Sequence, residues 1–119
     1  MRDQAVEIRV SDFGDIGTRV VLVGKLDIAG AEKIELPLAT VAGARGKIVI
    51  DMTGVSFISS IGVRHLVMAA NAVARRSGKL VLLAPNPLVT DVLVNAGLED
   101  LLPIVRSEDE ARIVLSAKA

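Results

Sequence analysis

The chain has 119 residues, a length suited to one domain, and we expect a single domain spanning residues 1–119. Its 14 basic and 14 acidic residues cancel, aromatic residues make up only 2%, and it has no cysteine and one histidine, which excludes disulfides and thiolate zinc sites and argues against nucleic acid as a partner. No apolar run approaches the ~20 residues of a membrane span and the start does not resemble a signal peptide, so we expect a cytoplasmic protein with no membrane insertion.

Apolar and charged residues alternate over residues 6–10, which predicts an outer strand exposed on one face. Three later runs are short, continuous and rich in β-branched residues, the pattern of strands buried on both faces. These central strands are expected at residues 20–23, 48–50 and 80–83. Residues 101–105 predict one more strand, and Pro103 favours a sheet edge because it cannot donate a backbone hydrogen bond.

Helical spacing of apolar residues predicts helices between these strands. We expect them at residues 31–41, 60–77, 87–95 and 107–115. Pro37 should kink the first helix or break it in two, and Ser107 with Glu110 should form a capping box at the start of the fourth. The inward face of the second helix is expected to hold Val63, Leu66, Val67, Ala70 and Ala74. Alternating strands and helices predict an α/β fold with a mixed, mostly parallel central sheet of about five strands and about four helices.

No catalytic constellation is recognisable in the chain. The glycine pairs at residues 14–17 and 43–46 lack the remaining positions of nucleotide-phosphate loops. Residues 54–58 begin like a nucleophile elbow but lack its closing glycine, and His65 is the only histidine that could act as a base. We therefore expect a protein that is not an enzyme and that uses no cofactor and no metal.

Charge is unevenly distributed along the chain. No Asp or Glu occurs between Met52 and Thr90, whereas the acids gather near the C-terminus. The acid-free interval contains Arg64, His65, Arg75, Arg76 and Lys79. Two interpretations remain open: these residues cover solvated helix faces that partly pair across the fold, or they form a mildly basic face that receives an acidic or phosphate-bearing partner.

The most informative segment covers residues 51–64, Asp-Met-Thr-Gly-Val-Ser-Phe-Ile-Ser-Ser-Ile-Gly-Val-Arg. We expect a buried strand to end at Asp51 and a turn to follow. Three apolar residues should anchor that turn in the core, namely Val55, Phe57 and Ile58. Paired serines then open a helix, and Ser59 is suited to be its N-cap, a contribution of about 1 kcal/mol.

This segment resembles the signature of STAS domains of anti-sigma factor antagonists: a strand ending in Asp, a short loop, an aromatic residue, then Asp-Ser or Ser-Ser before a small or apolar residue and Gly. Two further runs are similar to the same family, Gly24-Lys25-Leu26-Asp27 and the Val89, Leu93, Gly97, Leu98 pattern. The three matches follow one another in the family's order and spacing over nearly the whole chain. The resemblance implies the STAS-type fold.

The resemblance also implies site residues. The family's phosphorylated hydroxyl falls on Ser60, and its loop acid at the partner surface falls on Asp27. Ser59 stands where the family commonly has Asp, so both serines are candidate phosphoacceptors; we favour Ser60 because the Ser59 oxygen would be occupied as an N-cap. The expected partner surface comprises Asp27, Ser59, Ile61, Gly62, Arg64 and Met68.

The resemblance implies a bacterial partner-switching role in transcription regulation. The unphosphorylated protein would bind a serine-kinase anti-sigma factor and so release a sigma factor. Phosphorylation of Ser60 by that kinase would end binding, and a metal-dependent Ser/Thr phosphatase would restore it. The protein would act as a monomer or a weak dimer. Two alternatives share the fold: a stand-alone STAS subunit docked on a transporter ATPase, and a scaffold component of a stress-sensing assembly.

Overall fold

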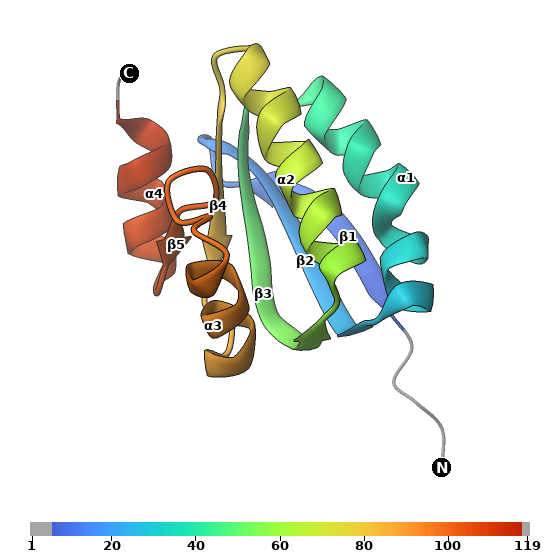
Figure 1. Ribbon diagram of the computed structural model, residues 1–119. Coiled ribbons are helices and arrows are strands. Elements are labelled where there is room, and N and C mark those ends of the chain that lie inside the picture. The colour runs from blue at the N-terminus through green and yellow to red at the C-terminus, as the bar shows by residue number, and fades with distance from the viewer. Residues whose placement is uncertain (1–5, 118–119) are drawn as a thin grey trace.

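A computed structural model describes residues 6–117 as a five-stranded sheet with four helices (Figure 1). In chain order the elements are β1 (Glu7–Phe13), β2 (Gly17–Leu26), α1 (Ile28–Ala44), β3 (Lys47–Ile58), α2 (Ser60–Arg75), β4 (Lys79–Leu83), α3 (Pro87–Asn95), β5 (Ile104–Val105) and α4 (Glu108–Ser116). The strands lie in the order β1-β2-β3-β4-β5; β1 pairs antiparallel with β2, and the other pairs are parallel. This confirms the predicted mixed, mostly parallel α/β fold.

The helices cover the two faces of the sheet unequally. The larger hydrophobic cluster lies between one face of the sheet and α1, α2 and α3, while a smaller cluster lies on the other face under α4 (Figure 1). Residues 48–50 are buried on both faces, as predicted for a central strand. The same prediction was wrong for β2, where Val20 and Leu22 are fully buried but Val21 and Val23 only half-buried, because α4 does not extend over this part of the sheet.

Helix α1 runs unbroken through Pro37, so the predicted break is wrong. Pro37 leaves the carbonyl of Lys33, four residues earlier, without its intrahelical donor, and Lys33 is exposed, so that carbonyl lies on the solvent side of α1. In α2 the buried stripe includes Ala69 and Val73, whereas Ala74, which the helical spacing placed inward, is exposed. None of the helices formed by residues 6–117 has the length and apolar character needed to cross a membrane.

Candidate functional site

Three helices begin at one edge of the sheet, where the parallel strands β2, β3 and β4 end (Figure 1). Each start is fixed in the same way: a polar side chain accepts a hydrogen bond from the backbone N–H three residues later. The three bonds join Gly30 N to Asp27 Oδ1 at 2.8 Å, Gly62 N to Ser59 Oγ at 3.2 Å, and Val89 N to Asn86 Oδ1 at 2.8 Å. We call this end of the sheet the helix-start edge. It comprises the caps Asp27, Ser59 and Asn86 and the exposed residues that follow each of them. In open α/β sheets, ligands commonly bind outside the carboxyl ends of the strands.

The two serines of the helix-start edge differ in their environment. Ser59 is half-buried; its N–H donates to Leu26 O at 2.8 Å and its hydroxyl accepts from Gly62, which confirms the predicted N-cap. Ser60 is the first residue of α2 and is exposed. The Ser60 hydroxyl is therefore accessible from solvent, whereas the Ser59 hydroxyl oxygen is already hydrogen-bonded to the backbone.

Two glycines let these helices approach the sheet closely. A Cβ built on Gly62 would lie 2.8 Å from Ile58 Cγ1, and one built on Gly30 would overlap the carbonyl oxygen of Lys25. Gly62 is also buried. Gly62 therefore positions the start of α2, and its direct contact with a partner stays a prediction.

The strand that leads into this edge is longer than the sequence suggested. It does not end at Asp51, because β3 keeps its pairing with β2 as far as Ile58, although its pairing with β4 stops at Asp51. Two register shifts, each adding one residue to β3, occur on the way. Asp51 accepts hydrogen bonds from the N–H and hydroxyl of Thr53, at 3.0 and 2.7 Å, and pairs with Arg19 at 3.4 Å.

Phe57 was expected to anchor this segment in the core, but the continued strand turns it outward. Its side chain is 37% exposed, and the Lys25 ammonium lies 5.8 Å from the ring centroid. Val55 and Ile58, in contrast, are buried as predicted. The end of β3 thus contributes one aromatic ring to the surface beside Ser60.

The model of the STAS domain matches residues 8–111, most of the chain. The chain belongs to the STAS domain family. It is 31% identical over 91 residues to BtrV of Bordetella bronchiseptica, whose name proposes that it is an anti-sigma factor antagonist, and the match covers 76% of this chain and 78% of BtrV.

Three solved structures share the fold of this chain. An anti-sigma factor antagonist from Mycobacterium paratuberculosis superposes with a TM-score of 0.82 at 24% identity, covering 94% of this chain and 95% of that one. SpoIIAA in its unphosphorylated form gives a TM-score of 0.75 at 21% identity, covering 95% and 100% of the two chains. The phosphorylated form of the Bacillus protein gives 0.70 at 23% identity, covering 91% and 99%.

In this STAS domain the helix-start edge carries apolar side chains that sequence analysis did not assign to the site. Ile28 and Leu88, near the starts of α1 and α3, are 62% and 55% exposed, and Ile61, which was assigned, is 36% exposed. The signal that could have found them is their position just after a helix cap, where a side chain projects beyond the end of the sheet. Together with Phe57 they give this edge an apolar character suited to a protein partner.

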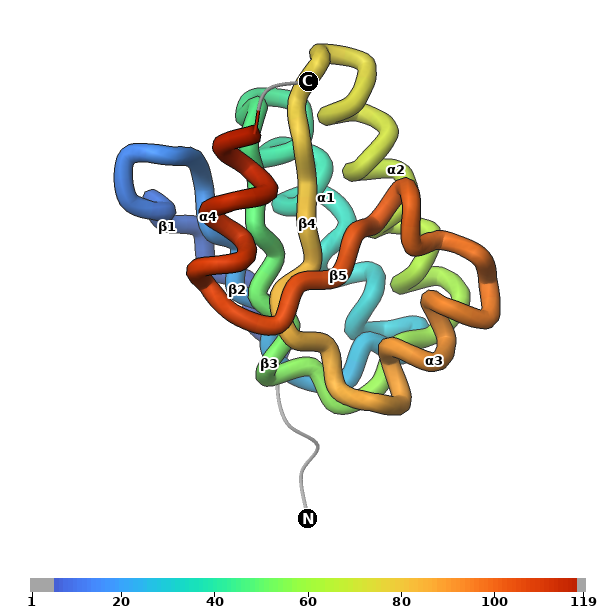
Figure 2. Tube along the Cα trace, turned by 90° about the vertical axis from the view of Figure 1, so that its left-hand side faces the viewer, coloured from blue at the N-terminus to red at the C-terminus, as the bar shows by residue number. Residues whose placement is uncertain are grey.

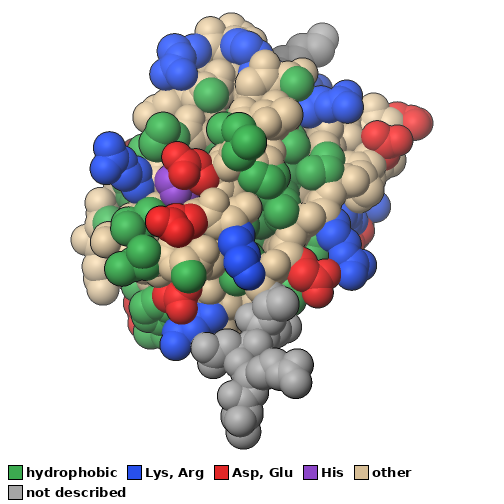
Figure 3. Space-filling view, turned by 90° about the vertical axis from the view of Figure 1, so that its right-hand side faces the viewer, with side chains coloured by type: hydrophobic (Ala, Val, Ile, Leu, Met, Phe, Trp, Pro, Cys, Tyr) green, Lys and Arg blue, Asp and Glu red, His purple; other side chains and the backbone are tan. Residues whose placement is uncertain are grey.

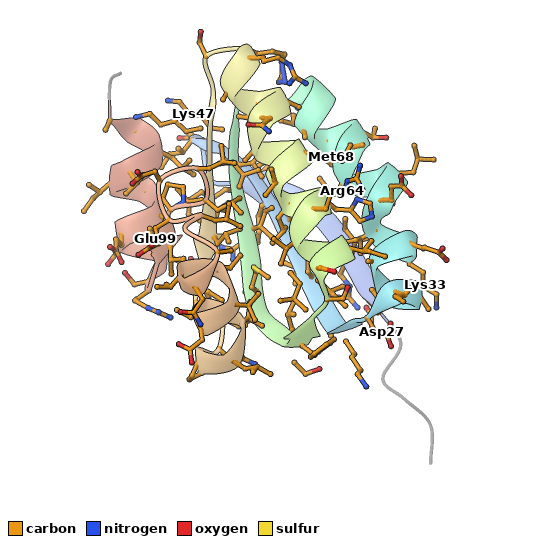
Figure 4. The ribbon with its side chains drawn as sticks, viewed as in Figure 1. Asp27, Lys33, Lys47, Arg64, Met68 and Glu99 are labelled. Atoms are coloured by element: carbon orange, nitrogen blue, oxygen red, sulfur yellow. The ribbon has the colours of Figure 1, made fainter. Side chains whose placement is uncertain are left out.

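Asp27 has a structural role in the STAS fold that its loop position did not reveal. It is half-buried and caps α1, which begins three residues earlier than predicted. Figure 4 shows Asp27 at this end of α1, with Arg64 and Met68 further along α2. Because Oδ1 of Asp27 accepts the hydrogen bond that caps α1, only its other carboxylate oxygen, Oδ2, is left to contact a partner.

Arg64 and Met68 lie on the outer face of α2 and are both exposed, and their contact with a partner stays a prediction. Met68 also borders a cavity of about 200 Å³ between α1 and α2, together with His65 and Glu35. Figure 3 shows the face that includes α1, where apolar side chains lie between acidic and basic ones. The outer face of α2 therefore continues the surface that begins at Ser60.

Proposed function

We propose that this protein is an anti-sigma factor antagonist whose unphosphorylated form binds a serine-kinase anti-sigma factor, and that phosphorylation of Ser60 ends that binding. The observation that carries the proposal is the division of roles between the paired serines. Ser59 is committed to capping α2, whereas Ser60 is exposed beside it. Like the family to which it belongs, the chain is a regulatory binding protein and not an enzyme. In this role it is the substrate of its partner kinase.

The relatives support this role by their names. BtrV and the Mycobacterium protein carry the name of anti-sigma factor antagonist, and SpoIIAA has a phosphorylated and an unphosphorylated form. The three solved structures cover 91–95% of this chain, and BtrV covers 76%. A metal-dependent phosphatase would complete the cycle by removing the phosphate.

The environment of Ser60 suits a phosphate without disturbing the fold. A phosphoserine adds about −1.5 to −2 charge, and backbone N–H groups at a helix start can donate hydrogen bonds to the phosphate oxygens. No Asp or Glu occurs between residues 52 and 90, so no carboxylate of α2 itself opposes the new charge. Arg64 lies one helical turn after Ser60, at the spacing at which side chains on one helix meet. Phosphorylation is therefore expected to change the surface and leave the core intact.

The same charge would prevent docking. A partner covering Ser60 would also cover Phe57 and Ile61, the apolar residues next to it. Burying a dianion in such a contact without a matching cation costs several kcal/mol, and each 1.4 kcal/mol lowers affinity about tenfold. Release of the partner follows from the location of the phosphate.

The test compares substitutions at Ser60 by calorimetric titration with the cognate anti-sigma factor. Ser60→Ala should bind like wild type, whereas Ser60→Asp and the phosphorylated protein should bind at least ~10-fold more weakly. Ser11→Asp is the matched control, because it adds the same charge at an exposed serine on β1, remote from the helix-start edge. The proposal fails if phosphorylated wild type binds as tightly as unphosphorylated wild type, or if mass spectrometry after incubation with kinase and ATP places the phosphate on Ser59 or Ser56 alone.

A further inference from the structure

The last strand of the sheet covers only part of its neighbour. β5 pairs with β4 at two positions, Leu82 with Ile104 and Leu83 with Val105, and the chain before it turns away at Pro103. Figure 2 shows β5 beside the later half of β4, with the earlier half of β4 uncovered on that side. The first residues of β4, from Lys79 to Val81, therefore have an open edge.

The backbone direction at this edge follows from the bonds on either side. Lys79 N–H donates to Gly46 O on the β3 side at 2.8 Å, while Leu82 N–H donates to Pro103 O on the β5 side at 2.8 Å. Successive residues of a strand direct their backbone groups to alternate neighbours, so Leu80 directs its N–H and C=O toward the β5 side, as Leu82 does. Within residues 6–117 no backbone group pairs with Leu80 on that side.

This open edge forms the floor of an apolar cleft of about 530 Å³. One wall is the C-terminal half of α2, where Ala70 and Ala74 have small side chains, and the opposite wall is α4, with Ile113 and Val114. Ile113 is 70% exposed. A backbone donor and acceptor thus lie between two apolar walls, one on each face of the sheet.

We propose that this cleft binds an extended apolar peptide of another protein, which adds to the edge of β4 as a short strand. A segment of about three residues spans ~10 Å when extended, which matches the open stretch of β4. Its side chains would alternate between the wall of α2 and the wall of α4, and its backbone would pair with Leu80. Small alanines on the α2 side leave room for a branched side chain there.

The charged residues at the rim of the cleft indicate which charge the flanking residues of that peptide should carry. Asp100 lines the cleft and is exposed, whereas the Lys79 ammonium donates to the carbonyl oxygens of Val114 and Ala117 and so is occupied by the last turn of α4. Lys79 keeps its charge at the end of α4, and among the described residues that line the cleft Asp100 is the charged side chain left to pair with a peptide. A peptide with an apolar centre and a basic flank fits this surface better than one with an acidic flank.

The test uses the synthetic peptide acetyl-Arg-Val-Ile-Val-Arg-amide and the whole protein labelled with ¹⁵N. In the free protein the Leu80 amide should exchange with solvent faster than the Leu82 amide, which is bonded to Pro103. Added peptide should shift the signals of Leu80, Leu101 and Val114 and slow exchange at Leu80 by at least ~10-fold. Methylating the central amide nitrogens of the peptide should weaken binding by about 5-fold or more, since each lost hydrogen bond counts.

Matched variants complete the test. Ala74→Phe fills one wall of the cleft and should weaken peptide binding at least ~10-fold. Ala39→Phe makes the same change at an exposed alanine of α1 and should bind like wild type. The proposal is overturned if the peptide shifts no signal in the cleft, if the N-methylated peptide binds equally well, if the signals that move belong to β1, the other edge strand, or if Ala74→Phe binds like Ala39→Phe.

Discussion

Replacing Gly30 by alanine should destabilise the protein, although alanine is intrinsically the better helix former. The gain in helix propensity is about 0.5–1 kcal/mol. Against it, the new Cβ would overlap the Lys25 carbonyl oxygen and come within 2.9 Å of Val6 Cγ2. Overpacking costs about 1–3 kcal/mol, and the upper value applies where the obstacle is backbone. The net loss in the free energy of unfolding is then about 2 kcal/mol.

The same helix provides the control. Gly43 also lies in α1, but a Cβ built there meets nothing within 4 Å. Gly43→Ala should therefore stabilise the protein by about 0.5–1 kcal/mol. Urea denaturation should place the two variants on opposite sides of wild type with an unchanged m-value. If Gly30→Ala were as stabilising as Gly43→Ala, the close approach of α1 to the end of β2, and with it the geometry of the Asp27 cap, would be wrong.

Three further changes separate structural from functional roles. Ser59→Ala should lower the free energy of unfolding by about 1 kcal/mol, whereas Ser60→Ala should change it by less than ~0.5 kcal/mol; equal effects in chemical denaturation would contradict the cap. Asp27→Asn keeps a capping oxygen and removes the charge, so stability should be retained while binding to the anti-sigma factor falls. Unchanged binding would mean that the Asp27 charge does not contribute to partner binding. Glu108→Gln breaks the 2.9 Å pair with Arg19, and because Glu108 is half exposed the loss should be below ~1 kcal/mol and should shrink in ~1 M salt. A loss that high salt leaves unchanged would mean that packing, and not charge, is responsible.

Local patterns were sufficient for the regular elements. The bounds of α3 agree residue for residue with the prediction, because Pro87 suits the first helical position and Gly97, at φ +72°, suits the left-handed conformation after the last turn. The edge position of the last strand also followed from one residue, Pro103, although only Ile104 and Val105 pair with β4. In both cases a single residue type restricts the backbone by itself.

The end of β3 could not be predicted, because its conformation depends on the neighbouring strand. The buried residues Met52, Val55 and Ile58 are spaced three apart, not two, since a bulge follows each of the first two. Such spacing hides the strand period and resembles a turn. The pairing with β2 supplies the missing information, and it also determines that Phe57 faces solvent.

The site was predictable in its polar residues and not in its packing. The Ser59 cap follows from the serine before an apolar helix, whereas the matching arrangement of Asp27 with Gly30 becomes evident only when α1 is seen to begin at Ile28. Burial of Gly62 could not be read from the sequence either, since it depends on how closely Ile58 approaches. Residue type indicated the chemistry, and distances between elements decided which residues remain accessible.

The shared starting edge of the helices gives an uncharged chain an electrical orientation. Each helix carries roughly half a positive charge at its start and half a negative charge at its end. In α4 the acids Glu108, Asp109 and Glu110 offset the positive end, and in α1 the Asp27 cap does so, whereas the caps and first turns of α2 and α3 contain no acidic residue. An acidic surface that comes within about one Debye length, ~10 Å at 0.1 M salt, would therefore be attracted to the starts of α2 and α3, beside Ser60, more than to those of α1 and α4. The chain is neutral overall, yet an approaching acidic partner meets different local charge at different helix starts.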